Sequence, residues 1–145
     1  MLDWLLPLAH AEQDPCYHPE GDALFHSLQV FEHALADNPS AILLAAALFH
    51  DVGKAVSGPD HDRVGAEMLD GLPSATRWLV RHHLDLLRTP KQTKAMLYGT
   101  PELRALKQLR DWDLAGRSPT AWVREPEEAI AIVCEELAGA PNSLS

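Results

Sequence analysis

Cysteine and positive charge are both scarce in this 145-residue sequence. Its two cysteines, Cys16 and Cys134, lie far apart and in no spacing typical of metal ligands, and they suit a reducing compartment. There are 12 Lys and Arg against 21 Asp and Glu, and the net charge of −9 disfavours a broad nucleic-acid-binding surface. No apolar run is long enough to span a bilayer, and Asp3 stands where a signal peptide would carry Lys or Arg. We therefore expect a cytoplasmic protein that binds neither membranes nor, broadly, nucleic acids.

The sequence also lacks strand-like alternation, internal repeats and low-complexity tracts. Apolar residues instead recur at helical spacing, and 46% of all residues are hydrophobic, as in ordinary globular proteins. We expect one domain over residues 1–145, of the all-α class, folded as a single compact bundle of about seven or eight helices. Asp22, Ser40 and Thr100 are the expected N-caps of three helices, the last of which should end at Gly116. Further helices are expected over residues 61–72, 75–88, 95–98 and 126–137.

An imidazole and a carboxylate stand side by side in the segment ALFHDVGK, at His50 and Asp51. The strongly apolar run over residues 42–49 predicts that they lie at the edge of the core. Neighbours in mid-helix diverge by about 100°, so the two side chains can converge only at a helix end, where Gly53 lets the backbone turn away. A ring nitrogen and a carboxylate oxygen at one point form a site for a divalent cation. The alternative is a buried histidine that is hydrogen-bonded to the neighbouring aspartate.

Helical phase gives different answers for two further candidates. His26 lies opposite the main apolar stripe of its helix, so phase alone leaves its direction open. Asp113 continues the buried stripe formed by Leu106 and Leu109, whereas Asp111 lies on the polar side. A carboxylate on an apolar stripe is unfavourable unless it is paired or binds metal.

Histidine is unusually common, and seven of the eight histidines fall between residues 18 and 83. Taken singly, each candidate is more simply explained as a satisfied buried polar group. Taken together, they favour a metal site, and nitrogen and oxygen ligands without thiolate favour manganese, iron or magnesium over structural zinc. The candidates are His26, His50, Asp51 and Asp113, with His61 and the pair His82 and His83 also available.

The order of these motifs resembles the HD-domain superfamily of metal-dependent phosphohydrolases. The resemblance extends over residues 17–117 and rests on FHSLQV, ALFHDVGK, HDRVGAEML, LVRHH and DWDLAGR. HPEGDALFHSLQVFEHAL and DWDLAGR look most like the HD domain of bacterial CCA-adding tRNA nucleotidyltransferases. No nucleotidyltransferase domain precedes these motifs and the surface should be acidic, so we expect neither nucleotide addition nor a tRNA substrate.

The resemblance implies a ligand set and a chemistry. It implies that His26 points inward and that Asp113, not Asp111, is the last ligand. Ligands to a first ion would be His26, His50, Asp51 and Asp113, and His61 and His83 would hold a second ion that Asp51 bridges. His83 is preferred to His82 because the family's histidine usually precedes an apolar residue, here Leu84. There would be two divalent ions, and their identity could be Fe, Mn, Mg, Ni or Co. The reaction would be hydrolysis of a small phosphomonoester, nucleotide or cyclic phosphodiester.

Three basic residues are candidates for contacts to the substrate phosphate. Lys54 follows the His-Asp pair directly and is expected, with Asp51, to take part in catalysis as well as binding. Arg81 and Arg117 could also meet a phosphate oxygen, although an arginine in such a position is more often a solvated surface charge.

Two other functions remain open from the sequence. HDRVGAEML, TRWLVRHH and the Arg-x-Trp-Asp that ends at Asp113 also resemble HD-fold di-iron oxygenases that act on organophosphonates or polyols, for which His61 and His83 would be indispensable. The basic and aromatic segment expected after the last histidine of such an enzyme is replaced here by LDLLRTP. A non-catalytic nucleotide-binding module is disfavoured by the intact ligand set. The sequence leaves the oligomeric state open.

Overall fold

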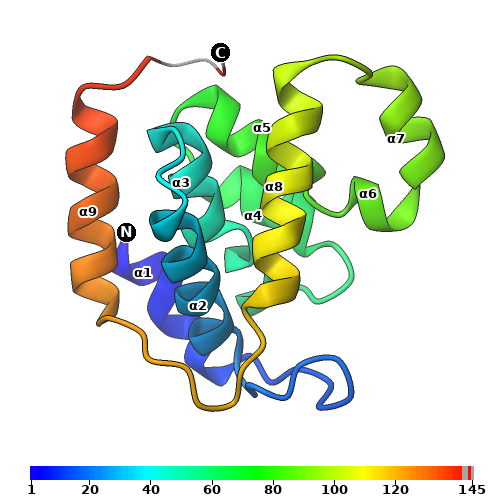
Figure 1. The fold of residues 1–145 in the computed structure, drawn as a ribbon. Coiled ribbons are helices and arrows are strands. Elements are labelled where there is room, and N and C mark those ends of the chain that lie inside the picture. Colours follow the sequence, from blue (N-terminus) through cyan, green and yellow to red (C-terminus); the bar gives the residue numbers. More distant parts are fainter. Residues whose placement is uncertain (142–143, 145) are drawn as a thin grey trace.

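The computed structural model describes residues 1–141 and 144, and these residues form helices and connecting loops with no β-strand (Figure 1). The all-α prediction is confirmed, and seven of the described helices have at least seven residues. The elements are α1 (Leu2–Leu5), the 3-10 turn η1 (Leu6–His10), α2 (Ala23–Ala36), α3 (Ala41–Phe49), the 3-10 turn η2 (Val52–Ala55), α4 (His61–Met68), α5 (Ser74–His82), α6 (Asp85–Arg88), α7 (Pro90–Met96), α8 (Pro101–Ala115) and α9 (Pro126–Ala138).

Helix α3 is the centre of the fold. Every one of its residues is buried, because α2, α5, α8 and α9 all pack against it (Figure 1). A helix that is apolar on all sides is stable only in such a position. Its C-terminal end therefore delivers His50 and Asp51 to the inside of the bundle, where both are at most 2% exposed.

The predicted helix caps are confirmed. The side chain of Asp22 accepts a hydrogen bond from the backbone N–H of Phe25 at 2.8 Å, and Ser40 and Thr100 cap α3 and α8 in the same way. As the N-cap, Asp22 fixes the start of α2 at Ala23, three residues before His26. Helix α8 ends at Gly116 as predicted, with Asp113 in its last turn.

Three predicted boundaries are wrong. The helix expected over residues 75–88 breaks at His83, because the ring of His83 donates from Nδ1 to the carbonyl of Val80, the group that Leu84 would bond in a continuous helix. Helix α7 covers Pro90–Met96 and not the expected residues 95–98, because Pro90 suits the first helical position and starts the helix earlier. Helix α4 ends at Met68, before the expected residue 72.

Gly53 acts differently from the prediction. It lies inside η2 and has no left-handed backbone conformation. A Cβ at this position would instead collide with the carbonyl of His61 and lie 2.7 Å from the backbone nitrogen of Gly65. The absence of a side chain lets α4 pack directly on η2, which places His61 beside the carboxylate of Asp51.

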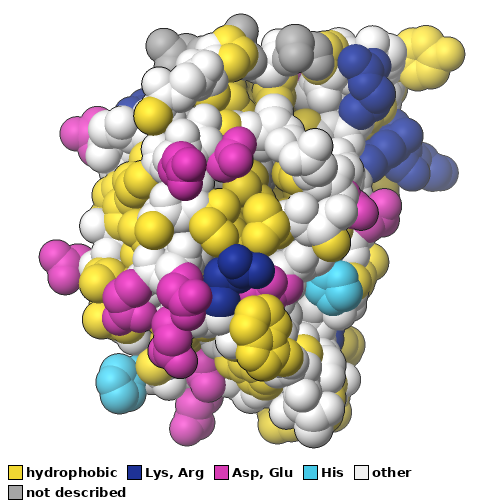
Figure 2. Space-filling view, turned by 60° about the vertical axis from the view of Figure 1, so that its left-hand side comes forward, with side chains coloured by type: hydrophobic (Ala, Val, Ile, Leu, Met, Phe, Trp, Pro, Cys, Tyr) yellow, Lys and Arg dark blue, Asp and Glu magenta, His cyan; other side chains and the backbone are white. Residues whose placement is uncertain are grey.

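None of the helices in the described part of the chain combines the length and the apolar character needed to cross a membrane. Acidic side chains are spread over the face that carries α9, in keeping with the net charge (Figure 2).

Candidate metal centre

The carboxylate of Asp51 lies between two groups of imidazoles. Its Oδ2 atom is 3.3 Å from Nε2 of His50 and 3.6 Å from Nε2 of His26. Its Oδ1 atom is 3.3 Å from Nε2 of His61 and 3.5 Å from Nε2 of His83. The four rings come from α2, the end of α3, the start of α4 and the end of α5. We call these five residues, together with Asp113, the Asp51 centre.

Three of these rings are held in the same way. In each, Nδ1 donates to the backbone carbonyl three residues earlier in the chain. The pairs are His50 with Ala47 at 2.9 Å, His61 with Gly58 at 2.7 Å, and His83 with Val80 at 2.6 Å. A proton on Nδ1 leaves the lone pair of a neutral ring on Nε2, the atom that faces Asp51. Backbone hydrogen bonds of this kind are what orients histidine ligands at metal sites.

Asp113 completes the side of the centre that carries His26. Its Oδ1 is 2.8 Å from Nε2 of His26 and 3.7 Å from Nε2 of His50. Asp113 is buried and Asp111 is exposed, so the helical phase distinguished the two aspartates correctly. The inward direction of His26, which phase left open, is also confirmed by its complete burial.

Charge pairing outweighs burial for most groups of the centre. Burial alone would favour the neutral form of each group, but the carboxylates of Asp113 and Glu20 raise the pKa of His26 to about 9, and those of Asp51 and Asp113 raise that of His50 to about 10. The same contacts hold the pKa of each of these aspartates well below its usual range, despite burial. His83 differs, because burial lowers its pKa. Without a cation, protons on His26 and His50 balance the two carboxylates, and a bound metal would displace those protons.

The residues of the centre could hold divalent metal. Nε2 of His50 and Nε2 of His83 are buried, and neither has a hydrogen-bond partner among the described residues. Ligand atoms converge within 4.8 Å of one another in each of two sets, His26 with His50 and Asp113, and Asp51 with His61 and His83. Donors that are only nitrogen and oxygen match Mn, Fe, Co or Ni. His82 lies outside both sets, since its Nδ1 contacts Asp85 Oδ2 at 2.7 Å and its ring packs on Trp78.

A pocket of about 390 Å³ adjoins the centre at Lys54. The ammonium of Lys54 is 3.1 Å from Asp51 Oδ2 and donates a 2.6 Å hydrogen bond to Oε1 of Gln13. Arg117 is close to the same region, with Nη2 3.9 Å from Asp113 Oδ1 and Nη1 donating to the carbonyl of Tyr17. The pocket is lined by Ala11, Glu12, Gln13, Asp14, His18, Lys54 and Gly58.

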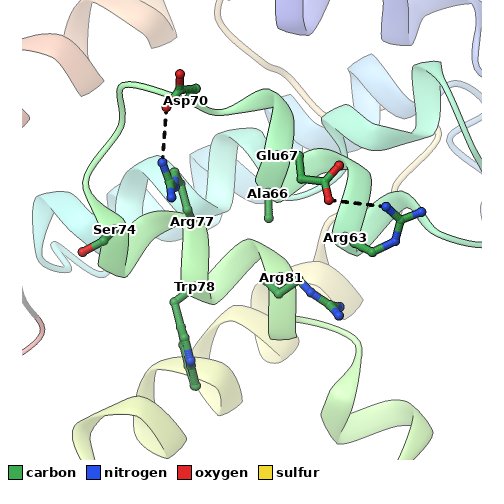
Figure 3. Close-up of a pocket in the computed structure, with 8 residues that line it drawn as sticks. All are labelled: Arg63, Ala66, Glu67, Asp70, Ser74, Arg77, Trp78 and Arg81. Carbon is green, nitrogen blue, oxygen red and sulfur yellow. Dashed lines mark hydrogen bonds and ion pairs between the residues drawn. The ribbon is translucent and has the colours of Figure 1, made fainter.

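Arg81 is not brought to this centre. It is 3.7 Å from Asp62 Oδ2 and lines a different pocket, of about 540 Å³, on the outer side of α4 and α5 (Figure 3). None of the residues that line this pocket in the described structure belongs to the Asp51 centre. We call it the arginine pocket, and its lining residues are Arg63, Ala66, Glu67, Asp70, Ser74, Arg77, Trp78 and Arg81.

Several residues beside the centre were not predicted from the sequence. Gln13, His18 and Glu20 come from the loop before α2. Arg110 lies one helical turn before Asp113, with 3.6 Å between Nη1 and Oδ2. The clustering of histidines from His18 onward was the one signal that could have drawn attention to that loop.

Comparisons with known proteins agree with this geometry. The sequence model of the HD domain family matches residues 24–115. The chain is 31% identical over 133 residues to the multifunctional CCA protein of Acinetobacter baumannii, which covers 85% of this chain and 31% of that protein. It is 42% identical over 60 residues to the multifunctional CCA protein of Herminiimonas arsenicoxydans, covering 41% of this chain and 14% of that protein.

A third relative carries a different activity in its name. The bifunctional uridylyltransferase/uridylyl-removing enzyme of Corynebacterium glutamicum is 28% identical over 116 residues, covering 65% of this chain and 17% of that enzyme. The chain thus spans less than a third of the length of each of these relatives. HD domains bind divalent metals and are usually hydrolases. The family match covers most of the chain, and the histidine and aspartate side chains of the centre are buried together, so this chain belongs to the HD domain family.

Proposed function

We propose that the protein is a metal-dependent phosphohydrolase that acts on a small phosphomonoester, nucleotide or cyclic phosphodiester. The observation that carries this proposal is the position of Asp51, whose two oxygens each face a separate pair of imidazole Nε2 atoms. A carboxylate that faces two ligand sets is suited to bridging two cations, as in two-metal phosphoester hydrolysis.

Each set of ligand side chains is assigned to one of two metal ions. His26, His50, Asp51 and Asp113 would hold one divalent ion, and Asp51, His61 and His83 would hold the other. When bound, such ions polarise a phosphoryl oxygen and lower the pKa of a coordinated water. The protein contributes rigidity, because the backbone carbonyls bonded to Nδ1 fix the rings of His50, His61 and His83 before substrate arrives.

Lys54 is the positively charged side chain that we propose binds the substrate phosphate, in addition to the metal ions. It lies at the boundary between the Asp51 centre and the 390 Å³ pocket, where it contacts both Asp51 and Gln13. An ammonium there can donate to a phosphoryl oxygen and keep donating as negative charge develops on that oxygen. Arg117 would assist from the side of Asp113.

A small substrate fits the surroundings of the pocket better than a polymer. Glu12 and Asp14 line it alongside Lys54, and the chain as a whole carries a net charge of −9. Extended phosphate backbones would be repelled by this charge, whereas a single phosphate near Lys54 would not.

The test combines metal analysis with a substrate screen. Protein purified without added metal should contain close to two divalent ions per chain, and it should hydrolyse at least one member of a panel of phosphomonoesters, cyclic phosphodiesters and nucleotides. Turnover should be equal with and without oxygen. Oxygen-dependent turnover of a phosphonate would replace the proposal with the oxygenase, and a nucleotide-binding protein without turnover would replace it with the binding module.

A further inference from the structure

Glu20 is a buried carboxylate that the proposed mechanism does not use. Its side chain is completely buried, although it comes from the loop before α2. Oε2 lies 2.8 Å from Nδ1 of His26, and Oε1 lies 3.4 Å from Nδ1 of His18. Neither oxygen accepts a well-directed hydrogen bond from the described residues, so the two imidazoles are its nearest partners. A buried carboxylate with so few partners lowers the stability of the fold, which points to a purpose for its charge other than stability.

The contact with His26 is on the side of the ring away from Asp51. Nε2 of His26 faces Asp113 and Asp51, while Nδ1 lies 2.8 Å from both the carbonyl of Gly116 and Glu20 Oε2. The carbonyl alone is enough to orient the ring. The additional negative charge makes Nε2 a stronger donor toward a cation, as carboxylates behind histidine ligands do.

These contacts also argue against a third ion between His18, Glu20 and His26, although their ligand atoms are close enough to hold one. The Nδ1–H of His26 is directed at the carbonyl of Gly116, so its proton would have to leave before Nδ1 could bind a cation. A ring that binds one cation through Nε2 resists binding a second through Nδ1.

The contact with His18 leads to the substrate pocket. His18 lines the same 390 Å³ pocket as Lys54 and Gln13. Its Nδ1 is buried against Glu20, which leaves Nε2 as the ring nitrogen available to a molecule in the pocket. Nε2 donates to a phosphate only when both ring nitrogens carry protons, and the carboxylate of Glu20 on one side and a phosphate on the other both favour that form. Glu20 therefore lies between an imidazole of the Asp51 centre and an imidazole of the pocket.

We infer that Glu20 is a positioning residue for both rings: its charge strengthens His26 as a metal ligand, and it aims His18 at a phosphate group held beside Lys54. His18 is accordingly a further phosphate-binding residue. This inference rests on the proposed metal-dependent function. It means that the loop before α2, which carries His18 and Glu20, contributes to the site.

The first experiment measures metal affinity in the complete chain. Metal-free wild-type protein and Glu20→Gln are titrated with Mn²⁺, and both are repeated with His83→Ala, which leaves only the set around His26 intact. Glu20→Gln should weaken the ion at this set by about 10- to 100-fold and leave the other ion unchanged. Glu127→Gln, an exposed glutamate on α9, is the matched control and should alter neither ion.

The second ion separates this role from a structural one. Glutamine keeps the shape of the side chain but removes the charge that faces the protonated His26 ring of the metal-free protein, so some loss of metal-free stability is expected in either case. A variant that weakens only the ion at the set around His26 has lost a positioning group, because a disturbed fold would weaken both ions. Equal weakening of both ions would assign Glu20 to the fold and overturn the inference.

The second experiment tests His18 with inorganic phosphate as the probe. His18→Ala should bind Mn²⁺ as the wild type does, while the Mn²⁺-loaded variant should bind phosphate about tenfold more weakly. Unchanged phosphate affinity would remove His18 from the pocket's function, and unchanged Mn²⁺ affinity in Glu20→Gln would refute the effect on His26. If the wild type binds two ions but cleaves no phosphoester, the proposed function fails while these affinities still decide the inference. If the wild type binds no divalent ion, both fail.

Discussion

The Asp51 centre and the arginine pocket are both clusters of opposite charges, but they are built in opposite ways. In the arginine pocket, Arg63, Arg77 and Arg81 are 41–47% exposed, and each has a carboxylate at 3.4–3.7 Å (Figure 3). In the Asp51 centre the side chains are buried, and two ring nitrogens have no hydrogen-bond partner among the described residues. In the arginine pocket Nε of Arg77 also lacks such a partner, but within a side chain that is 41% exposed. Exposed pairs lose little if they are broken, whereas buried unpaired groups persist only where something else binds them. Burial therefore supports the Asp51 centre as the proposed functional site, although the arginine pocket is the larger of the two hollows.

The largest contrast is expected between Asp51→Ala and Asp70→Ala. Loss of Asp51 removes the group shared by both ligand sets, so bound metal should disappear and activity should fall by about 10³-fold or more. Asp70, which pairs with Arg77 in the arginine pocket, should be dispensable. Metal analysis, a phosphoester assay and circular dichroism measure these effects, and full metal occupancy in Asp51→Ala would defeat the assignment.

The next contrast separates two aspartates on one helix. Asp113→Asn should reduce metal affinity and activity by about 100-fold, because it removes the charge that faces His26 and His50. Asp111→Asn changes an exposed side chain and should leave activity within about twofold of the wild type. The reverse result would mean that α8 presents its other face to the metal.

Gly53→Ala should disturb the centre without changing any of its side chains. The added Cβ would meet the backbone of His61 and Gly65, and backbone atoms cannot move aside as a flexible side chain can. We expect about 2–3 kcal/mol lower stability, measured by urea unfolding, together with weaker binding of the ion on the His61 side. Gly139→Ala is the control, because a Cβ there meets no atom within 4 Å.

A smaller contrast is expected between two basic residues. Lys54→Ala should raise KM for the phosphoester about tenfold, since it removes the cation between the Asp51 centre and its pocket. Arg81→Ala should leave KM unchanged, because Arg81 contacts Asp62 outside that pocket. A rise in KM for Arg81→Ala alone would shift the substrate toward the arginine pocket.

The smallest effect is expected at the partly buried ion pair of Glu32 and Arg124, which is also joined by hydrogen bonds. Glu32 accepts hydrogen bonds from the side chain of Arg124 at 2.7 and 3.0 Å, which outweigh burial and hold the pKa of Glu32 below its ordinary value. Glu32→Gln should therefore cost about 1–2 kcal/mol of stability at pH 7. A lowered pKa stabilises the folded state above the unfolded value of about 4.3, so the difference should vanish as pH falls through the lower folded pKa. Unfolding measured at several pH values tests this, and a pH-independent difference would contradict it.

Local patterns predicted the parts of the centre that depend on one helix at a time. Helical phase placed Asp113 inside and Asp111 outside, and the caps at Asp22, Ser40 and Thr100 fixed where their helices begin. The apolar run before His50 placed the His-Asp pair at the edge of the core.

Other features depend on contacts between distant segments, which sequence periodicity does not encode. The break at His83 depends on a ring that captures a backbone carbonyl of its own helix. The burial of Glu20 depends on a loop that folds onto His26, and the place of Arg81 depends on Asp62, a buried aspartate on the neighbouring helix. The close approach of Gly53 to Gly65 likewise becomes visible only once η2 and α4 are packed together.

The loop before α2 and the stretch matched by the family contribute different residues to the site. All six residues of the Asp51 centre lie within residues 24–115, the stretch matched by the family. Gln13, His18 and Glu20, which adjoin the pocket and the back of His26, all precede that stretch. Substitutions in this leading segment can therefore change which molecules are accepted while the inherited ligands stay intact. Under the proposed function, the pocket residues Gln13 and His18 and the residues that hold the metal belong to different stretches of the chain, and each stretch can be substituted without touching the other.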